Sequence, residues 1–516
     1  MMEVLRTILR DVSGQEYAGD IQHLIEKISN LLEHKRYFIV VDDLWDSQSW
    51  GTIKCAFLKN SCGSTIITTM RINDVAESCS SSHQGRIYKL RPLNDEDSRG
   101  LFLKRIFGTK EGCPSHLAEV SNDILQKCGG LPLAILSIAG LLAGKATTFD
   151  EWNKVQCSFG YELERQSDIN KMIQILSLSY FDLPPHLRSC LLYLSMFPED
   201  YNIGKDRLVL RWIAEGFIHE EHGFTQYELG ERCFNELINR SLIQPVVLRD
   251  WSTVTHCRVH DIILEFIVSR AVEENFVTLF GVPNTICDPH RMIRRLSLQD
   301  RNEIGHAVVD LREKMVYSHT RAVSVFTYCF DSVPSLDKFR HVRVLDLEDY
   351  WLLKTKHLAH LGRLFTMRYL SLCKTGICEL PEEIGELQYL QTLDVRDTML
   401  NELPSSVVRL ARLVNLLCDH HVRLPDGFGS MQALQRLGAI GLSCQPPGFA
   451  HELCQLRNLR TLEVRVYKFT KGVASSLPTL GAGSLDSLII TVGARFRKLM
   501  MEPWSTTPLS LKLLKI

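Results

Sequence analysis

The sequence predicts a multidomain chain in which a partial parallel α/β sheet and helical regions precede a leucine-rich-repeat solenoid. Three observations lead to this fold class. An apolar strand near the start of the chain ends in two carboxylates, helical periodicity dominates the middle, and leucines recur at a regular interval after Val342. Helix–strand alternation is typical of parallel sheets, and a leucine unit repeated every 20 to 29 residues is typical of a solenoid.

The composition is that of an ordinary globular protein. The chain has 516 residues, of which 45% are apolar and 23% charged, and its formal net charge is −1. This balance gives no global attraction to nucleic acid or to an anionic membrane. The 16 cysteines lack paired or CxxC spacing, which indicates a reduced intracellular protein. The sequence shows neither a signal peptide nor an apolar run long enough to span a membrane.

The first predicted strand covers residues 37–41 and ends in Asp42 and Asp43. Five consecutive apolar residues favour a strand that is buried on both faces. Open parallel sheets place their chemistry beyond the carboxyl ends of the strands, where two carboxylates are costly to desolvate without a cation. In nucleotide-binding proteins with a P-loop, Mg²⁺ on a phosphate fills this place. The alternative is a turn or helix cap that uses the two aspartates.

The elements around this strand are predicted from their periodicity. Apolar residues at helical spacing mark a helix over residues 21–32, and β-branched or apolar runs predict further strands at 64–69 and 86–90. From Pro92 the pattern is helical, with a break at Gly129-Gly130 inside 114–142. No G-x-x-x-x-G-K-[ST] phosphate-binding loop occurs in the sequence.

Five further motifs follow in order. They are Gly63–Arg71, which closes a strand on an arginine; Cys128–Ile135, which contains Gly-Leu-Pro-Leu; Cys190–Tyr201; Arg211–Ile218; and Val259-His260-Asp261. Together with the repeats, this series resembles the plant NB-ARC leucine-rich-repeat immune receptors, the intracellular disease-resistance proteins. The resemblance covers nearly the whole chain. The family has Met-His-Asp where this chain has Val-His-Asp, which is a departure at the apolar position.

The resemblance implies five regions. Residues 1–91 would be a partial nucleotide-binding α/β domain from the Walker B strand onward, and 92–171 a helical domain with the Gly-Leu-Pro-Leu motif. Residues 172–275 would be a winged-helix domain with the Val-His-Asp motif, 276–318 a linker or a first irregular repeat, and 319–516 the repeats. In the family, a coiled-coil domain and the P-loop precede the Walker B strand, so we expect a chain truncated at its N-terminus. The last residues, 511–516, look like the start of another strand, so we expect a truncated C-terminus as well.

The resemblance also implies a nucleotide site for ADP or ATP with Mg²⁺, weak or absent here because the phosphate loop is missing. Asp42 would hold Mg²⁺, Asp43 would orient water in a slow hydrolysis, and Arg71 would contact the γ-phosphate. Pro132 would lie near adenine, beside Gly130 and Leu131, and His260 would contact the β-phosphate of ADP. From the residues alone, the His-Asp pair reads as the cap of the helix at 262–268, and Gly-Leu-Pro as a structural helix start.

The repeats can be aligned without family knowledge. Their first strand leucines are Leu345, Leu370, Leu393, Leu416, Leu437, Leu462 and Leu488. Outward-facing residues of these strands would line a concave face, the usual binding surface of a solenoid. We therefore predict partner contacts there, through Asp346, Glu348, Tyr369, Ser371, Asp394, Arg396, Asp419, Glu463 and Arg465. The alternative is a ladder of polar residues that only keeps the surface solvated.

The leading functional hypothesis is a cytoplasmic immune receptor, with peripheral binding at the plasma membrane as a variant. ADP would clamp its domains at rest, and a pathogen effector or a guarded host protein would bind the repeats to trigger defence and the hypersensitive response. The alternative is a non-enzymatic interaction fragment, a sensor or decoy that does not switch. DNA binding by the winged helix is disfavoured because no basic cluster stands out, and NTPase activity because the P-loop lysine is missing.

Overall fold

The structure is a computed structural model. It describes residues 2–15, 17, 19–57, 62–83, 85–109, 112–145, 147–157, 168–247, 254–281, 292–299, 315–326, 334–446, 448–466, 485–492 and 513–515. The chain divides into two compact units, Met1–Pro92 and Leu93–Ile516. Each unit is described by itself below.

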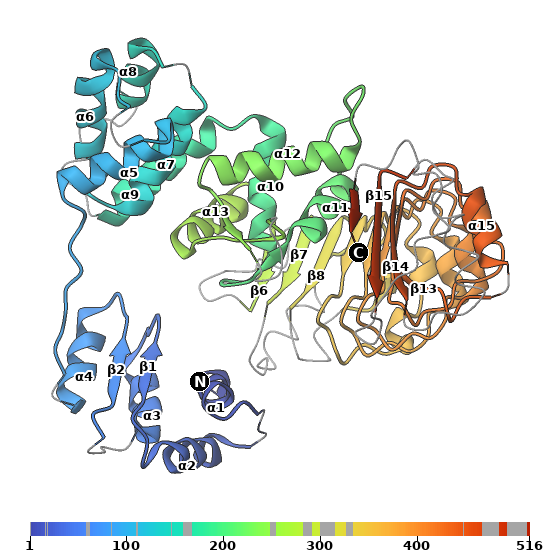
Figure 1. The fold of residues 1–516 in the computed structure, drawn as a ribbon, viewed down its shortest axis with the longest axis horizontal. Coiled ribbons are helices and arrows are strands. Elements are labelled where there is room, and N and C mark those ends of the chain that lie inside the picture. The colour runs from blue at the N-terminus through green and yellow to red at the C-terminus, as the bar shows by residue number, and fades with distance from the viewer. Residues whose placement is uncertain are drawn as a thin grey trace. The chain divides into compact units, whose positions relative to one another are not determined.

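The first unit is a small α/β unit. Its elements are α1 (Met2–Ser13), α2 (Ile21–Leu32), β1 (Phe38–Val41), α3 (Ser47–Ile53), β2 (Thr65–Thr68) and α4 (Asn73–His83). The predicted helix at 21–32 is confirmed, and the side chain of Asp20 caps it by accepting from the backbone N–H of His23. Strands β1 and β2 pair in parallel, and leucines of α1 and α2 share one core with Val41 (Figure 1).

Two expectations about this sheet are wrong. The predicted strand at 86–90 is not formed, since residues 85–94 have no regular structure and Tyr88 and Leu90 are 84% and 88% exposed. Strand β1 is also not buried on both faces, because Phe38 and Val40 are 66% and 53% exposed. Side chains alternate along a strand, and in the described residues of this unit only the face of Val41 is covered by helices.

The second unit begins with four helices, α5 (Asp95–Phe107), α6 (Ala118–Cys128), α7 (Pro132–Ala143) and α8 (Phe149–Cys157). Asn94 caps α5 at its N-terminus, where acidic residues fill the first turn, and Gly108 ends it with a left-handed φ of 76°. Helix α7 is apolar on nearly every side and is therefore buried. Its Gly140 permits a close approach, because a Cβ there would lie 2.7 Å from the backbone of Arg240.

A winged-helix arrangement follows. Helix α9 (Asp168–Phe181) leads into it and packs mainly on α7, and its own helices are α10 (Pro185–Leu192), α11 (Lys205–Glu215), α12 (Gln226–Asn239) and α13 (Asp261–Glu273). The strands β3 (Ile203–Gly204), β5 (His256–Arg258) and β4 (Gln244–Val246) form a small antiparallel sheet in that order. A capping box between Thr225 and Glu228 starts α12.

The repeats form one parallel sheet of 11 described strands, ordered β6 to β16. These are β6 (Thr278–Phe280), β7 (Arg295–Leu298), β8 (Ala322–Val325), β9 (Val344–Asp346), β10 (Tyr369–Ser371), β11 (Thr392–Asp394), β12 (Asn415–Leu417), β13 (Arg436–Gly441), β14 (Thr461–Val466), β15 (Ser487–Val492) and β16 (Leu513–Lys515). The predicted strands near 345, 370, 393 and 416 are confirmed, as is a strand within 511–516. Because β6 and β7 join the same sheet, the solenoid already includes part of 276–318.

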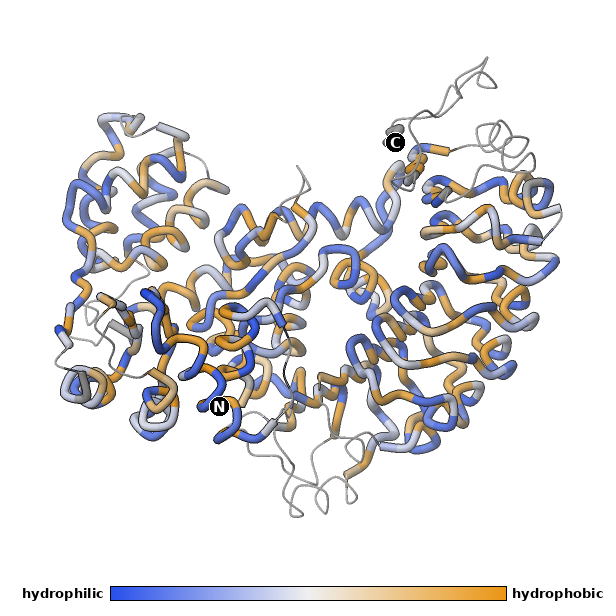
Figure 2. Tube along the Cα trace, turned by 60° about the horizontal axis from the view of Figure 1, so that its bottom comes forward, coloured by the Kyte–Doolittle hydropathy of each residue, from blue (hydrophilic) through white to orange (hydrophobic). Residues whose placement is uncertain are grey.

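The repeat core depends on alternation along each strand. Leu345, Leu370, Leu393 and Leu416 lie inside the solenoid, where they pack with residues from the short 3-10 turns that return the chain to the next strand. Helix α15 (Phe449–Gln455) replaces such a turn in one repeat. Figure 2 shows apolar residues recurring along successive turns. Each repeat therefore buries its leucines only by stacking on its neighbours.

Candidate functional site

The carboxyl edge of the β1–β2 sheet brings together three predicted site residues. The Thr69 hydroxyl donates to Asp42, and it accepts from the backbone N–H of Asp43 at 2.8 Å. Asp43 has a φ of 53° and accepts from the indole N–H of Trp45 at 2.9 Å. The Arg71 guanidinium lies 3.5 Å from the carboxylate of Asp43 and 5.0 Å from the Trp45 ring. Asp42, Asp43 and Arg71 thus form one exposed cluster.

The donor set at this edge fits a hard cation in part. Carboxylate and hydroxyl oxygens from Asp42 and Thr69 are the ligands that Mg²⁺ takes in proteins. Asp42 is exposed, so its carboxylate faces solvent. Asp43 is already paired with Arg71, which places a positive charge beside the same edge. The arrangement therefore suits a phosphate together with a cation better than a cation alone.

The Gly-Leu-Pro motif forms the turn between α6 and α7. Gly129 and Gly130 both adopt left-handed backbone, with φ of 61° and 70°, which strains other residues. Pro132 occupies the first turn of α7, where its missing N–H costs nothing. The carbonyl of Gly130 accepts from the backbone N–H of Leu93 at 2.9 Å. The turn thus contacts Leu93, which begins the second unit. Pro132 itself is exposed.

His260 has a capping role in the structure. It is the N-cap of α13, and its Nδ1 accepts from the backbone N–H of Ile262 at 3.3 Å. The alternative prediction from the sequence, that the His-Asp pair caps this helix, is therefore confirmed for His260. A cap uses Nδ1 and leaves Nε2 for a ligand, so capping does not exclude the predicted phosphate contact. Asp42, Asp43 and Arg71 belong to the first unit, whereas Gly130, Leu131, Pro132 and His260 belong to the second.

The winged-helix domain covers part of the inner face of the repeat sheet. In strands β8 to β10 and β12, the residues Ala322, Val344, Tyr369 and Leu417 belong to the same core cluster as the winged-helix residues. Their sequence neighbours Val323, Leu345, Leu370 and Leu416 belong to the repeat core instead. Alternation along the strand thus divides each repeat between two cores. Helix α11 lies directly against β9 and β10.

A charged stripe on α11 provides the polar part of this contact. Arg207, Arg211 and Glu215 are spaced by four residues, which places them on one face of the helix. All three are buried, with exposures of 6%, 0% and 5%. Glu215 accepts two hydrogen bonds from Arg295 of β7, at 2.8 and 3.2 Å.

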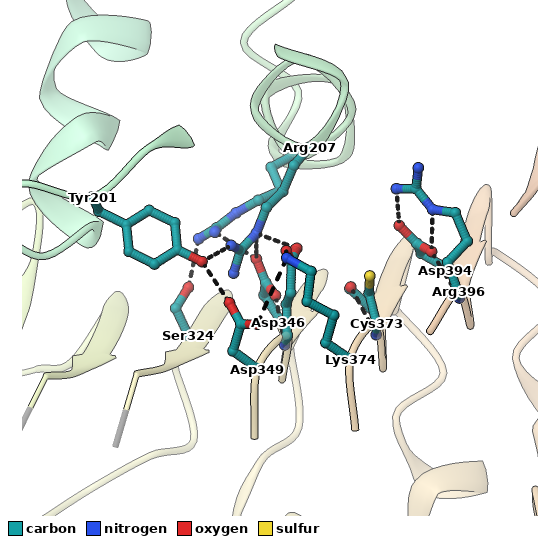
Figure 3. A network of polar contacts seen from close by, with 12 residues as sticks. Tyr201, Arg207, Ser324, Asp346, Asp349, Cys373, Lys374, Asp394 and Arg396 are labelled. Carbon is teal, nitrogen blue, oxygen red and sulfur yellow. Dashed lines mark hydrogen bonds and ion pairs between the residues drawn. The ribbon is translucent and has the colours of Figure 1, made fainter. Parts of the chain in front are cut away.

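Asp346 is the centre of the network (Figure 3). One of its oxygens accepts from Arg207 at 2.8 Å and from Arg211 at 2.6 Å, and Asp346 itself is fully buried. Burial would raise the pKa of Asp346, but the two guanidinium groups hold it below its usual range. Burial would lower the pKa of Arg207, but Asp346 and Glu348 hold it well above its ordinary value. The charges are thus mutually compensated inside the interface.

A second contact ties α11 to a more distant strand. Asp206, next to Arg207, accepts from Arg436 of β13 at 2.6 Å and from the hydroxyl of Tyr227 in α12. Burial would raise the pKa of Asp206, but mainly Arg436 lowers it, to about 2. One helix therefore contacts strands from β7 to β13, because the sheet curves around it.

The predicted partner-binding residues fall into two groups. Asp346, Tyr369, Ser371 and Asp394 are at most 3% exposed, and Glu348 lies 3.0 Å from Arg207. The winged-helix domain therefore occupies this part of the predicted face. Arg396 pairs with Asp394 at 2.6 Å, Asp419 accepts from the backbone N–H of Asp397, and Arg465 lies 3.8 Å from Glu463. Arg396, Asp419, Glu463 and Arg465 keep part of their surface in solvent.

Sequence reasoning missed the α11 stripe. The signal was present, since Arg207, Arg211 and Glu215 recur at a spacing of four residues among the apolar residues of 207–215. A charge on the apolar side of a buried helix requires a buried partner. In the part of the chain that the structure describes, no helix combines the length and the apolar character needed to cross a membrane.

Three protein families match the chain in separate regions. The NB-ARC domain family matches residues 1–112, the winged-helix domain of disease-resistance proteins matches 196–267, and a leucine-rich-repeat region matches 319–516. Among solved structures, a leucine-rich-repeat protein of Leptospira interrogans covers 48% of this chain and 74% of its own, at 16% identity and a TM-score of 0.29.

Similar proteins from plants cover most of the chain. Disease resistance protein Pik-2 of Oryza sativa subsp. japonica is 34% identical over 92% of this chain and 50% of its own length. Disease resistance protein RGA5 of the same rice is 31% identical over 96% and 45%, and RPP13-like protein 4 of Arabidopsis thaliana is 29% identical over 94% and 56%. The chain spans about half the length of these relatives. It belongs to the NB-ARC leucine-rich-repeat family of plant disease-resistance proteins.

Proposed function

We propose that this chain is the regulatory and sensing part of a plant immune receptor. In this proposal the repeats hold the winged-helix domain at rest, and a protein partner at the repeats releases it. The supporting observation is the buried contact of Arg207 and Arg211 with Asp346. A fully compensated buried network is stable as a whole, but removing one member typically costs about 3–5 kcal/mol. Such a contact has two distinct states, intact and open.

A nucleotide would be the second regulator of the receptor. We propose that Asp42 holds Mg²⁺, Arg71 and His260 contact phosphate, and Pro132 lies near the base. Bound Mg²⁺ would neutralise phosphate charge. Among this chain's own residues, Asp43 would keep Arg71 oriented, as their 3.5 Å contact suggests. We expect weak binding and no detectable hydrolysis, because the sequence has no phosphate-loop lysine.

The proposal is tested with Asp346→Asn, which removes the charge that compensates two arginines. The matched control is Asp397→Asn, an exposed aspartate of the repeats whose left-handed backbone asparagine tolerates. Hydrogen exchange measures whether α11 and β9 become less protected. Ion leakage from leaf tissue that expresses each chain measures the defence response.

We expect faster exchange at α11 and stronger ion leakage for Asp346→Asn, with the wild type and Asp397→Asn silent. A variant that opens the contact by hydrogen exchange yet gives the leakage of the wild type would contradict the switch. If Asp346→Asn leaves exchange unchanged, the network does not hold the two domains together, which also contradicts the proposal.

A second candidate function is an interaction protein that does not switch. It is favoured by the part of the repeat face where Arg396, Asp419, Glu463 and Arg465 keep some of their surface in solvent, because a protein partner could bind there without any nucleotide. Calorimetry with ADP separates the two candidates, with His260→Ala as the variant. Binding that is weakened by His260→Ala supports the nucleotide switch. No measurable heat favours the interaction protein, because a regulated nucleotide state requires that the nucleotide bind.

A further inference from the structure

Two cysteines of the winged-helix domain lie next to each other on neighbouring helices. Cys190 belongs to α10 and Cys233 to α12, and these two helices pack against each other. Cys190 is fully buried, whereas Cys233 is half-buried and packs against the same core cluster. Both are free thiols in the structure. One sulfur atom of the pair is therefore enclosed by the core, and the other lies toward the edge of the domain.

A hydrogen bond joins the two sulfur atoms. The thiol of Cys190 donates it to the sulfur of Cys233. This bond lowers the pKa of Cys233, against the effects of burial and of the neighbouring carboxylate of Glu236. Burial, together with the same bond, raises the pKa of Cys190 well above its ordinary value. The pair thus combines a thiol that ionises more readily than usual with one that stays protonated.

Two other buried cysteines of this unit illustrate a purely structural thiol. Burial raises the pKa of Cys128 in α6 and of Cys257 in β5 to about 12. A thiol that stays protonated in apolar surroundings is inert, because the thiolate is the reactive form. Packing accounts for such residues. Cys190 and Cys233 differ from them, because each sulfur has the other as its partner and one of the two is half-buried.

We propose that Cys190 and Cys233 form a modification site, at which hydrogen peroxide converts the two thiols into a disulfide. The Cys233 thiolate attacks one peroxide oxygen and the O–O bond breaks. Cys233 becomes a sulfenic acid, and the departing hydroxide takes up the proton that the thiol released. The sulfur of Cys190 then attacks the sulfur of Cys233, the S–O bond breaks, and the hydroxyl leaves with the Cys190 proton. Two thiols are oxidised, and one peroxide is reduced to two molecules of water.

The disulfide encloses α11, which lies between the two cysteines in the sequence. The new bond closes residues 190–233 into a loop. Such a loop has less conformational freedom when it opens, which favours the native arrangement of the enclosed segment. The enclosed helix carries Arg207, Arg211 and Glu215, whose buried contacts join it to the repeats. Oxidation therefore makes α11 more difficult to open. The formation of the disulfide does not depend on the proposed function.

The test oxidises the purified full chain with hydrogen peroxide, blocks the remaining thiols with an alkylating reagent and digests the chain with trypsin without reduction. Trypsin releases Cys190 in peptide 189–205 and Cys233 in peptide 233–240, and neither peptide contains a second cysteine. Mass spectrometry then measures the linked pair of peptides, before and after treatment with dithiothreitol. Hydrogen exchange compares α11 in the reduced and oxidised chains.

The variants are Cys233→Ser and Cys190→Ala. The matched control is Cys113→Ser, at another half-buried cysteine of the same unit, whose sulfur lies 3.7 Å from the hydroxyl of Ser121. Thermal unfolding shows whether each variant is folded. The measurement on the wild type tests the proposal even if a variant does not fold.

We expect the linked peptides in the oxidised wild type and in Cys113→Ser, and their release by dithiothreitol. The link should be lost in Cys233→Ser. In Cys190→Ala, dimedone should label Cys233 more strongly than in the wild type, because no second sulfur consumes the sulfenic acid. Exchange at α11 should become slower when the wild type is oxidised, and peroxide should not change it in Cys233→Ser.

Absence of the linked peptides at a peroxide dose that oxidises the exposed Cys157 would overturn the proposal. A disulfide that joins Cys233 mainly to a cysteine other than Cys190 would also overturn it. If the expected disulfide forms and exchange at α11 stays the same, the effect on α11 is refuted.

Discussion

At the scale of single residues, two aspartates show how the same side chain is used in different surroundings. Asp346 is fully buried between Arg207 and Arg211, so its charge depends on both partners. Asp206 keeps 31% of its side chain exposed, although Arg436 and Tyr227 both bind it. Solvent therefore screens part of the Asp206 interaction. The first network is suited to hold a contact closed, and the second adds a smaller contribution that depends on pH.

The Asp206 contact predicts a pH effect of defined sign. Its pKa is about 2 when folded against a reference value of 3.8, so the contact stabilises fully above about pH 4 and is lost as the pH falls toward 2. Allowing for screening, we expect Asp206→Asn to lower the free energy of unfolding by about 1–2 kcal/mol at neutral pH. Urea unfolding of both chains at several pH values measures the difference. A difference that stays constant down to pH 2 would contradict the assignment.

At the scale of secondary-structure elements, alternation along strands explains both what is buried and what is exposed. In β9 and β10, one set of side chains enters the repeat core and the other enters the winged-helix core. In β1 only one set is covered, and Phe38 and Val40 remain exposed. Burial on both faces makes the repeat strands difficult to open, whereas β1 and β2 are a pair with one covered face.

This difference predicts unequal protection of the two sheets. A two-stranded sheet is marginally stable because each strand has a free edge and little buried area. We expect the amide groups of β1 and β2 to exchange with solvent faster than those of β10 and β11. Hydrogen exchange followed by mass spectrometry measures this in the unmodified chain. Equal protection in the two sheets would show that the first unit is stabilised by contacts other than its own core.

At the scale of the whole molecule, the chain divides where its contacts are few. The winged-helix domain and the repeats lie in one unit because α11 contributes to a shared core and to a buried ionic network. The boundary between the units falls at Pro92, after a segment with exposed Tyr88 and Leu90. The chain thus has two compact units, although three protein families match it in separate regions.

The same division predicts where the chain is cut. Brief trypsin treatment should cleave after Arg86 or Lys89, because the backbone of residues 85–92 has no regular structure there, whereas Pro92 protects the bond after Arg91. Mass spectrometry should then find a fragment that begins near residue 92 and keeps the winged-helix domain joined to the repeats through the α11 contacts. Resistance of this segment while strands β9 to β12 are cut would contradict the division into units.

The sequence by itself determined the local elements and the order of domains. The leucine interval located β9 to β12, because a repeat buries its core through near neighbours whose spacing is written in the chain. Capping and turn residues such as Asp20 and Gly129 likewise act within a few positions. The position of Asp42 and Asp43 at the carboxyl edge of the sheet was also predictable, because the carboxyl ends of parallel strands lie at the same edge.

Only the tertiary structure decided which face of each element is used. The sequence predicts that the outward-facing residues of the repeat strands, beginning with Asp346 and Tyr369, line a free concave face. In the structure, the winged-helix domain covers the first part of this face. Likewise, the missing strand at 86–90 and the exposed face of β1 depend on neighbours that residue patterns do not specify. A buried charge such as Arg211 is tolerated only beside a partner 135 residues away. Such distant partners follow from the packing of whole domains, which local periodicity does not encode.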